Sequence, residues 1–330
     1  MRKTATAVIL ISALIVSTLT GLLLVDSTKA NSIIPLTYLP EITINSNGTI
    51  TPETDLIKRT GFTYTLTGDV EGYVIHIMAS KIVFDGAEYT INASGGDNSG
   101  VHLTDVTGVT VKNVEVIGRY TSIKLYYSSN CLLTNIKINY GMYLTEGSNY
   151  NTIENSTIKR LTIGLGNANN NLIIKNNLQE LWVSGPNNKF YQNNFFLTAA
   201  PGILTDNFWD NGSVGNYWSN YSRKYPTASE IGNTGIGDTP YVIERAIDPE
   251  LKDPDAKNVD NYPLMYPFGA PEITLLGMQN ATYSGSCFLI FTVSKSVVWM
   301  GYSLDGQDNV TVTGNITLSE LSRGLHNVTV

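Results

Sequence analysis

Residue types that carry crosslinks, metal sites or charge are scarce in this chain. Its 330 residues include only two cysteines and three histidines, and charged residues make up 15%. Two cysteines cannot build a disulfide framework, and Cys131 and Cys287 fall in what we predict to be different domains. We therefore expect both as free, buried thiols. The formal net charge of −7 argues against a nucleic-acid partner, because phosphates require a basic face.

The first 30 residues have the layout of a secretory signal. Arg2 and Lys3 precede an uncharged stretch that runs to Val25, and Thr28 and Ala30 place small residues at the −3 and −1 positions of a cleavage site. An uncleaved anchor is the alternative, because the apolar stretch approaches the roughly 20 residues that span a bilayer. Both interpretations predict that everything after residue 30 is exported. A membrane contact is expected only through this segment, and only if it stays uncleaved.

An asparagine recurs at intervals of about 20 residues in the middle of the chain, a period typical of short stacked coils. The recurring positions are Asn113, Asn135, Asn155, Asn176 and Asn193. We predict that their amides form a buried ladder at a corner of the coils, where asparagine tolerates a left-handed backbone. Asn155 also begins a glycosylation sequon, and an inward amide would leave it without a glycan.

Triplets in which apolar residues flank one variable residue give a second register. They occupy residues 75–77, 101–103, 123–125, 142–144, 161–163 and 181–183. Strand alternation sends the flanking pair inward and the middle residue outward. Stacked as parallel strands about 4.8 Å apart, the triplets form apolar columns inside and one variable column outside. The predicted fold is therefore all-β: a right-handed parallel β-helix with its repeats over residues 74–197.

Different patterns flank these repeats. Residues 31–73 contain short alternating runs and are predicted to form a lead-in that covers one open end. Residues 198–268 have no clean period and predict an irregular C-terminal cap. Residues 271–330 alternate strongly, with a hairpin turn at Asp305-Gly306. They predict part of an immunoglobulin-like β-sandwich, a domain of about 100 residues, so we expect its final strands beyond the last residue.

Asn-x-Ser/Thr sequons are frequent and, together with export, suggest a glycosylated surface protein. Chance alone gives several in a chain rich in asparagine and threonine, so their weight depends on export. Besides Asn155, the candidate glycosylation sites are Asn47, Asn92, Asn211, Asn220, Asn280, Asn309, Asn315 and Asn327.

Several stretches resemble the NosD-like β-helix family. Residues 207–221 begin Asn-Phe-Trp-Asp-Asn-Gly and end Gly-Asn-Tyr-Trp-Ser-Asn-Tyr. They are followed by Gly-Ile-Gly-Asp-Thr-Pro-Tyr at 235–241 and Val-Asp-Asn-Tyr-Pro-Leu-Met at 259–265, and Ile-Val-Phe-Asp-Gly-Ala at 82–87 is also similar. The resemblance covers residues 40–268. It implies a surface protein of the archaeal type, in which such a β-helix precedes immunoglobulin-like modules.

This resemblance also implies activities that the residues themselves leave open. The domain type is described as carbohydrate-binding and sugar-hydrolysing, and the namesake of the family assists copper-site maturation of nitrous oxide reductase. The chain departs from the family pattern where members often carry aspartate, with Glu230, Asn233 and Thr234 at those positions. It also inserts residues 248–255 before the Asn-Tyr-Pro element. Family membership therefore does not decide the activity.

A copper accessory role would need Cys, Met or His ligands gathered together. His76 and His102 fall in the outward column on adjacent coils, and the third histidine lies in the second domain. The column continues with residues that are not soft ligands: Lys124, Tyr143, Thr162 and Trp182. Histidines that face solvent are the favoured interpretation.

Polysaccharide cleavage, by a glycoside hydrolase or a lyase, is the rival hypothesis. Hydrolysis needs two carboxyl groups roughly 5–10 Å apart, and the outward columns offer no such pair. Glu115 beside Lys137 is more simply an ion pair between neighbouring strands. A lyase needs a base and a cation, for which Arg119 and Arg160 are candidates without evident partners. We assign no catalytic residue, and a non-catalytic role is favoured.

Hard oxygen donors gather in the predicted cap and suggest a calcium site. The predicted ligands are Glu230, Asn233, Asp238 and Asp260, with Asp253 or Asp255 as a further ligand. Their spacing is degenerate compared with an EF-hand, and turn roles for Asn233 and Asp238 are the alternative.

Aromatic residues of the outward column predict sugar binding. Tyr143 and Trp182 should face solvent, and an exposed ring can stack on the face of a pyranose. Trp209 and Trp218 are expected to pack over the mouth of the β-helix instead. We therefore predict an exported surface protein, structural or adhesive, that contacts surface glycans or envelope components along its flank.

Overall fold

The computed structural model describes residues 38–97, 99–199, 201–203, 205–232, 234–243, 258–271, 273–276, 286–295, 297 and 299–330. The predicted secretory signal lies outside these residues, as do Asn233, Asp253, Asp255 and Asn280. In the part of the chain that is described, no helix is long and apolar enough to cross a bilayer.

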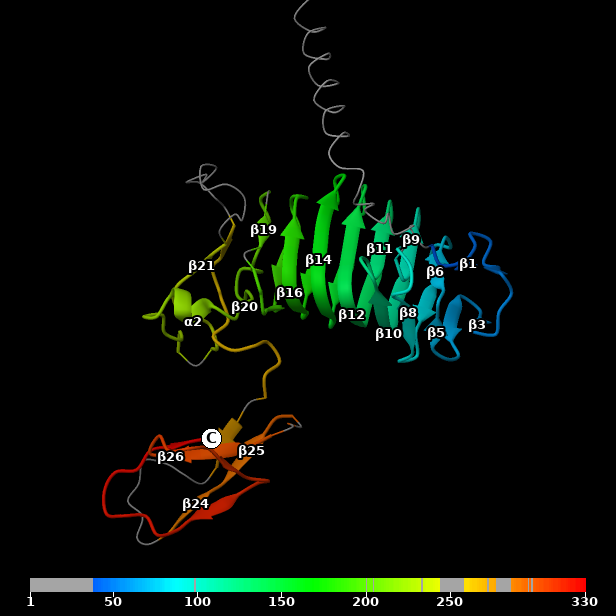
Figure 1. Cartoon of the computed structure of the whole chain (residues 1–330). Helices are drawn as coiled ribbons and strands as arrows, with labels where there is room; N and C mark the ends of the chain where they lie inside the picture. Colours follow the sequence, from blue (N-terminus) through cyan, green and yellow to red (C-terminus); the bar gives the residue numbers. More distant parts are fainter. Residues whose placement is uncertain are drawn as a thin grey trace, which may run out of the picture. The chain divides into compact units, whose positions relative to one another are not determined.

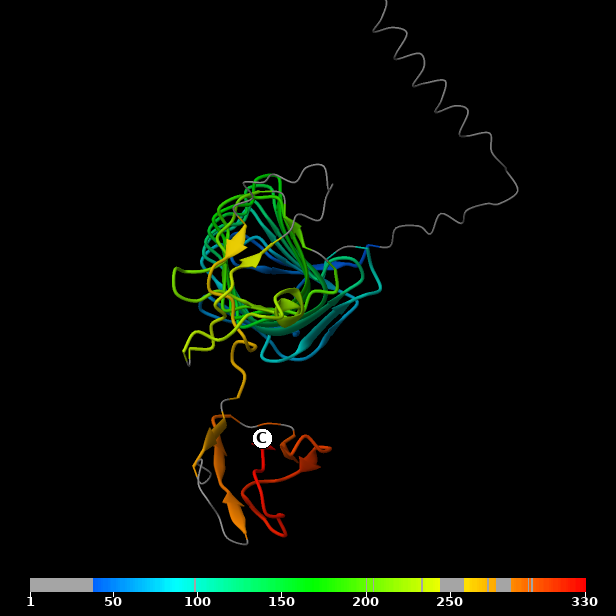
Figure 2. The ribbon, with the colours of Figure 1, turned by 90° about the vertical axis from the view of Figure 1, so that its left-hand side faces the viewer.

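Residues 41–218 form a parallel β-helix whose coils each pass through three faces (Figure 1). Figure 2 looks along the stacked coils. The first face consists of β1 (Glu41–Ile44), β6 (Val74–Ile77), β9 (Val101–Thr104), β11 (Ile123–Tyr126), the ends of β12 (Leu132–Thr145), β14 (Thr157–Leu165) and β16 (Asn177–Val183), and β19 (Gly202–Ile203).

The other two faces are built in the same way, with parallel pairing between successive coils. The second face consists of β4 (Thr63–Leu66), β7 (Val83–Asp85), the starts of β10 (Thr110–Gly118) and β12, β13 (Thr152–Glu154), β15 (Leu172–Ile174) and β17 (Lys189–Tyr191). The third face consists of β5 (Val70–Glu71), β8 (Thr90–Ala93), the end of β10, the middle of β12, the starts of β14 and β16, β18 (Asn194–Phe195) and β20 (Tyr217–Trp218).

The apolar triplets of the first face stack in the predicted register. His76 pairs with His102, and the same column continues through Lys124, Tyr143, Thr162 and Trp182. The flanking residues are no more than 5% exposed: Ile75, Ile77, Val101, Leu103, Ile123, Leu125, Met142, Leu144, Leu161, Ile163, Leu181 and Val183. Burial of these two continuous columns by the hydrophobic effect holds the first face against the core.

The β-helix begins earlier than the repeat pattern predicts. β1 and β4 already pair in parallel with the next coil, so residues predicted as a lead-in contribute a full coil. Two antiparallel strands cover this end, β2 (Ile50–Thr51) beside β1 and β3 (Ile57–Thr60) in a hairpin with β4. The excursion between β1 and β4 breaks the period, which is why the sequence pattern does not reveal the first coil.

Aromatic rings close the other end of the coils. α2 (Tyr221–Lys224) and the antiparallel pair β21 (Tyr241–Val242) and β22 (Val259–Asp260) follow β20. Trp218 stacks between Phe195 and Tyr241, with both centroid distances 4.3 Å. Trp209 stacks on Phe190 at 4.5 Å, and both tryptophans are 1% exposed. The prediction that these tryptophans pack over the mouth of the β-helix is therefore confirmed.

The C-terminal residues form small antiparallel sheets in the described part. They pair β23 (Ile273–Leu275) with β25 (Phe291–Val293), β24 (Cys287–Leu289) with β28 (Ile316–Leu318), and β26 (Gly301–Leu304) with β27 (Val310–Thr311) and β29 (Val328–Thr329). Asp305 and Gly306 have φ of 53° and 74°, and Gln307 N donates to Leu304 O, so the predicted hairpin turn is confirmed. Cys131 and Cys287 are free and buried, as predicted.

Candidate functional site

The five predicted ladder asparagines lie in two neighbouring columns instead of one. Asn113, Asn135 and Asn155 have φ of 53°, 52° and 49°, and by register Lys175 and Gln192 take the next places in this column, each at 58°. We call this left-handed set, whose side chains point outward, the corner column. Asn155 is exposed, so the predicted inward orientation is wrong, and burial gives no reason for it to escape glycosylation.

Only Asn176 and Asn193 belong to a buried ladder, which we call the inner column: Ser156, Asn176, Asn193, Asn216 and Asp260. Each backbone N–H donates to the side-chain oxygen of the next member, at 3.0, 3.0, 3.1 and 2.7 Å along the column. The asparagine amides donate to the same oxygens. Left-handed corners and amide stacking are thus served by adjacent residues, and the prediction merged the two.

A second buried column at another corner was not predicted. Its members are Asn151, Asn171, Asn188, Asn207 and Asn258, again joined from backbone N–H to side-chain oxygen. It ends where Trp209 Nε1 donates to Asn258 Oδ1 at 2.9 Å. The sequence did carry a signal, because Asn151, Asn171 and Asn188 each directly precede a strand of the second face.

Asp260 terminates the inner column and is completely buried. Its Oδ2 accepts from Trp218 Nε1 at 2.9 Å and from the backbone and side-chain nitrogens of Asn216, and its Oδ1 accepts from Tyr262 N. Burial raises the pKa of Asp260 to about 7 against the effect of these donors. The predicted role of Asp260 as a calcium ligand is therefore corrected: its oxygens are engaged in closing the column.

The remaining predicted calcium ligands have local hydrogen-bond partners. Asp238 Oδ1 accepts from Ser229 N at 3.1 Å and from the Thr239 hydroxyl, and Glu230 Oε1 accepts from Gly235 N at 2.7 Å. Among the described residues, no group of three or more His, Cys, Asp or Glu side chains is placed to hold a metal ion. A calcium site here stays a prediction, because Asn233 lies outside these residues.

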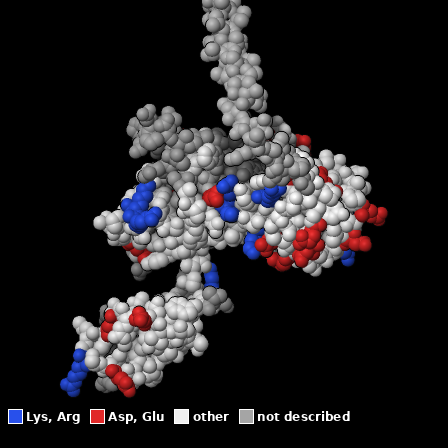
Figure 3. Space-filling view, in the orientation of Figure 1, with Lys and Arg blue, Asp and Glu red and all other residues white. Residues whose placement is uncertain are grey.

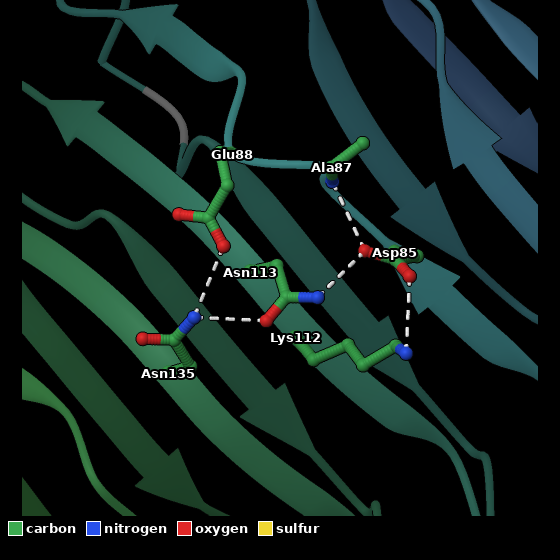
Figure 4. Close-up of polar contacts among 6 residues, drawn as sticks. All are labelled: Asp85, Ala87, Glu88, Lys112, Asn113 and Asn135. Atoms are coloured by element: carbon green, nitrogen blue, oxygen red, sulfur yellow. Dashed lines mark hydrogen bonds and ion pairs between the residues drawn. The ribbon is translucent and has the colours of Figure 1, made fainter.

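The corner column begins in a polar network around Asn113 and Asn135 (Figure 4). Asn135 Nδ2 donates to Asn113 Oδ1 at 2.8 Å and to Glu88 Oε1, and Asn113 Nδ2 donates to Asp85 Oδ1. Lys112 Nζ lies 3.0 Å from Asp85 Oδ2. Burial raises the pKa of Asp85, but the donors around it outweigh burial and leave the pKa below its ordinary value. The network pairs Lys112 with Asp85 and joins neighbouring coils through Asn113 and Asn135, so we interpret it as structural.

The middle residues of the first-face triplets, from His76 to Trp182, form what we call the outer column. Its two histidines lie on adjacent coils, with ring centroids 5.8 Å apart. His76 uses both ring nitrogens, Nδ1 with Glu41 Oε2 at 3.0 Å and Nε2 with Thr104 Oγ1 at 2.9 Å. Ser99 N donates to His102 Nε2. Burial, and then the neighbouring His76, lower the pKa of His102 to about 4, so His102 is neutral near pH 7. The pair supplies no cluster of open soft ligands.

Most charges weighed for catalysis are engaged in ion pairs. Lys137 Nζ lies 2.9 Å from Glu115 Oε1, which confirms the predicted pair between neighbouring strands. Two further pairs, at 2.6 and 3.1 Å, are Arg160 with Glu180 and Arg119 with Asp97. The expectation that these arginines lack partners is wrong. The pattern missed the partners because they lie 20 and 22 residues away, on neighbouring coils.

Tyr143 and Trp182 both point away from the core, and one coil, that of Thr162, lies between them. Trp182 is 39% exposed and Tyr143 is half-buried. A Cβ at Gly202 would clash with the indole, and one at Gly141 would clash with the Tyr143 ring, so each ring lies against a glycine. The phenol of Tyr143 also interacts electrostatically with Arg160. The two rings therefore have fixed places on the surface, about 10 Å apart by coil spacing.

A hollow of about 670 Å³ lies beside α2. Its wall includes the Trp218 and Tyr241 rings, with Arg223 and Lys224 at the helix. Figure 3 shows basic side chains gathered at α2. Lys224 Nζ donates to Val242 O at 2.7 Å and lies 4.8 Å from the Tyr241 ring centroid. This ammonium therefore holds α2 to β21, and the hollow offers less free charge than its composition suggests.

Comparison with known proteins supports the fold and no individual activity. Residues 99–220 match the family model of the right handed beta helix region, which spans the coils from β9 to β20. The chain folds as a right-handed parallel β-helix. No curated protein and no solved structure shows a significant match. The predicted fold class is confirmed, and the NosD-like and immunoglobulin-like assignments remain resemblances.

Proposed function

We propose that this chain is an exported surface protein whose β-helix binds extended glycans along its first face without cleaving them. One observation carries the proposal. Tyr143 and Trp182 occupy the same outer column, two coils apart, and each ring rests on a glycine. Aromatic rings that lie on the surface beside a glycine offer apolar area on which a pyranose can stack.

The column repeat suits a polymer better than a single sugar. A polysaccharide that lies across the strands meets an equivalent surface position at each coil, about 4.8 Å further along. Tyr143 and Trp182 would then contact alternate stretches of one chain, with Thr162 between them. Because the rings are already ordered before binding, little conformational entropy is lost on contact.

Engaged charges support binding over cleavage. The groups considered for hydrolase or lyase chemistry, Glu115, Arg119 and Arg160, each form an ion pair with a residue on a neighbouring coil. A catalytic acid or base needs a group free to exchange a proton with the substrate. The copper accessory role receives no comparable support, since His76 uses both ring nitrogens within the protein.

Surface exposure of the sequons supports an exported glycoprotein. Asparagines at exposed sequons are Asn47, Asn155, Asn211, Asn309, Asn315 and Asn327. Asn92 and Asn220 are half-buried, and Asn220 Oδ1 accepts from the Tyr241 hydroxyl. The secretory layout of residues 1–30 and the resemblance to NosD-like archaeal surface proteins belong to the same proposal.

A glycan array probed with the full chain tests the proposal. We expect binding that falls at least about tenfold in Tyr143→Ala and in Trp182→Ala, with no new reducing ends or unsaturated products. Phe62→Ala is the matched control, because Phe62 is 74% exposed in the β3–β4 hairpin, away from the outer column. The proposal is contradicted if Tyr143→Ala and Trp182→Ala bind glycans as well as Phe62→Ala does, or if cleavage products appear.

A further inference from the structure

A small hollow opens on the first face, on the N-terminal side of Tyr143. It has a volume of about 160 Å³ and is lined by His102, Thr104, Lys124 and Tyr126, with Leu103 beneath. Ligand sites for larger molecules usually exceed about 300 Å³, so this space suits a single sugar ring. Lys124 pairs with Tyr143 on the next coil, which makes the hollow continuous with the proposed glycan surface.

The lining combines a ring, a hydroxyl and an ammonium group. Tyr126 is 36% exposed, and Lys124 Nζ lies 5.3 Å from the centroid of its ring. Within the described residues, no ion pair joins Lys124 to a carboxylate. Since His102 is neutral near pH 7, Lys124 is the charged member of this hollow.

Two carboxylates lie past the other end of the hollow. Asp105 directly follows β9 and is exposed, and Glu146 directly follows β12. A Cβ at Gly166 would clash with the carboxylate of Glu146, so this side chain leans toward the next coil. The charges of Glu146 and Asp105 both act on Tyr126 and so make this end of the hollow the acidic one. An anionic ligand group is therefore favoured at the Lys124 end, and the hydroxyls of the same sugar at the Asp105 end.

We propose that this hollow is a subsite for one uronic acid residue, with the sugar carboxylate on Lys124 and the ring against Tyr126. The glycan bound by the first face is then an acidic polysaccharide, whose neighbouring residues reach Tyr143 and Trp182. This inference rests on the proposed function. Charge-assisted hydrogen bonds are stronger than neutral ones, and they are stronger still where the surroundings partly exclude water.

Matched glycan pairs test the inference. The probes are polygalacturonate, alginate and hyaluronan, each beside its carboxyl-reduced derivative, which keeps the sugar chain and removes the charge. Titration calorimetry on the full chain should show at least one acid form binding about tenfold or more tighter than its reduced form. Raising the salt concentration should weaken only the acid form.

Lys124→Met keeps an apolar stem against Tyr126 and removes the charge. It should bring the acid-to-reduced affinity ratio near one while the reduced form binds as before. Lys137→Met changes the net charge equally on the third face and should leave the ratio intact. Circular dichroism confirms that both variants fold. Equal affinity for acid and reduced forms, or an unchanged ratio in Lys124→Met, overturns the inference while the proposed function survives. Absence of binding to every probe also overturns the inference, and the proposed function fails with it only if the glycan array shows no binding either.

Discussion

Asn216 donates both its backbone N–H and its side-chain amide to a single oxygen of Asp260, at 2.7 and 3.3 Å. The asparagines before it make the same pair of bonds to the next asparagine, so Asp260 closes the inner column with a carboxylate in place of an amide. Because this carboxylate is completely buried, the inner column ends in a titratable group, whereas its other members are neutral.

The stability of the protein should fall as pH rises because of Asp260. Its pKa is about 7 in the folded protein against an ordinary 3.8, so the folded state binds more protons than the unfolded state between these values. The contribution is present below about pH 4 and lost as pH rises through about 7. Urea unfolding across this range should give a free energy of unfolding that falls with rising pH in the wild type, without the same fall in Asp260→Asn. Equal pH dependence in the two proteins would contradict the assignment.

Truncation of the same residue should be far more costly than the amide substitution. Asp260→Ala leaves the buried N–H groups of Asn216 and Trp218 without an acceptor, at about 1–3 kcal/mol each, and removes the acceptor of the part-buried Tyr262 N–H. We expect a loss of several kcal/mol by urea unfolding, whereas Asp260→Asn keeps an acceptor oxygen. Similar losses in both variants would show that the hydrogen bonds are unimportant.

Two asparagines of the original repeat should respond differently to mutation. Asn193→Ala removes a buried amide and the acceptor of Asn176 N, so we expect a loss of about 1–3 kcal/mol. Asn155→Gly, at an exposed left-handed position, should change stability by less than about 0.5 kcal/mol. Chemical unfolding of both variants checks this, and equal effects would argue for a single ladder.

Gly202→Ala should impair glycan binding without reaching any ligand. A methyl group there would clash with the Trp182 indole and force the ring off the surface. Overpacking of this kind costs about 1–3 kcal/mol, and affinity should fall together with that of Trp182→Ala. Gly68→Ala is the control, since no atom lies within 4 Å of the added methyl group. Unaltered affinity in Gly202→Ala would mean that the indole position is irrelevant.

Both cysteines should resist thiol reagents until the protein unfolds. Cys131 is 2% exposed, and burial raises its pKa, so little thiolate forms near neutral pH. Cys287 is also 2% exposed. Ellman titration should detect two thiols only after denaturant is added. Rapid reaction of one thiol in the native protein would place that cysteine outside the core.

Inward and outward alternation made the first face predictable. Ile75 and Ile77 around His76 follow the strand period, and each later coil repeats them, so register and exposure could be derived from the sequence. The asparagine columns were harder. Asn155 and Asn176 differ by 21 positions where the coil advances by 20, and a shift of one residue turns a side chain from outside to inside.

Partners across coils were hidden for a different reason. Arg160 meets Glu180, and Asp260 meets Asn216, only because stacking places distant residues side by side. Residue types alone suggested a lyase cation and a calcium ligand. The first coil escaped prediction as well, since the excursion after β1 leaves no fixed spacing to detect.

Both buried columns are one-way. Every backbone N–H points its donor toward the following coil, so a coil is complete only when its successor has been made. The N–H of Asn207 finds its acceptor only at Asn258, 51 residues later, and that of Asn216 only at Asp260, 44 residues later. A chain that ended before these residues would leave buried N–H donors without acceptors at both corners. The last coil therefore depends on the cap to satisfy its backbone.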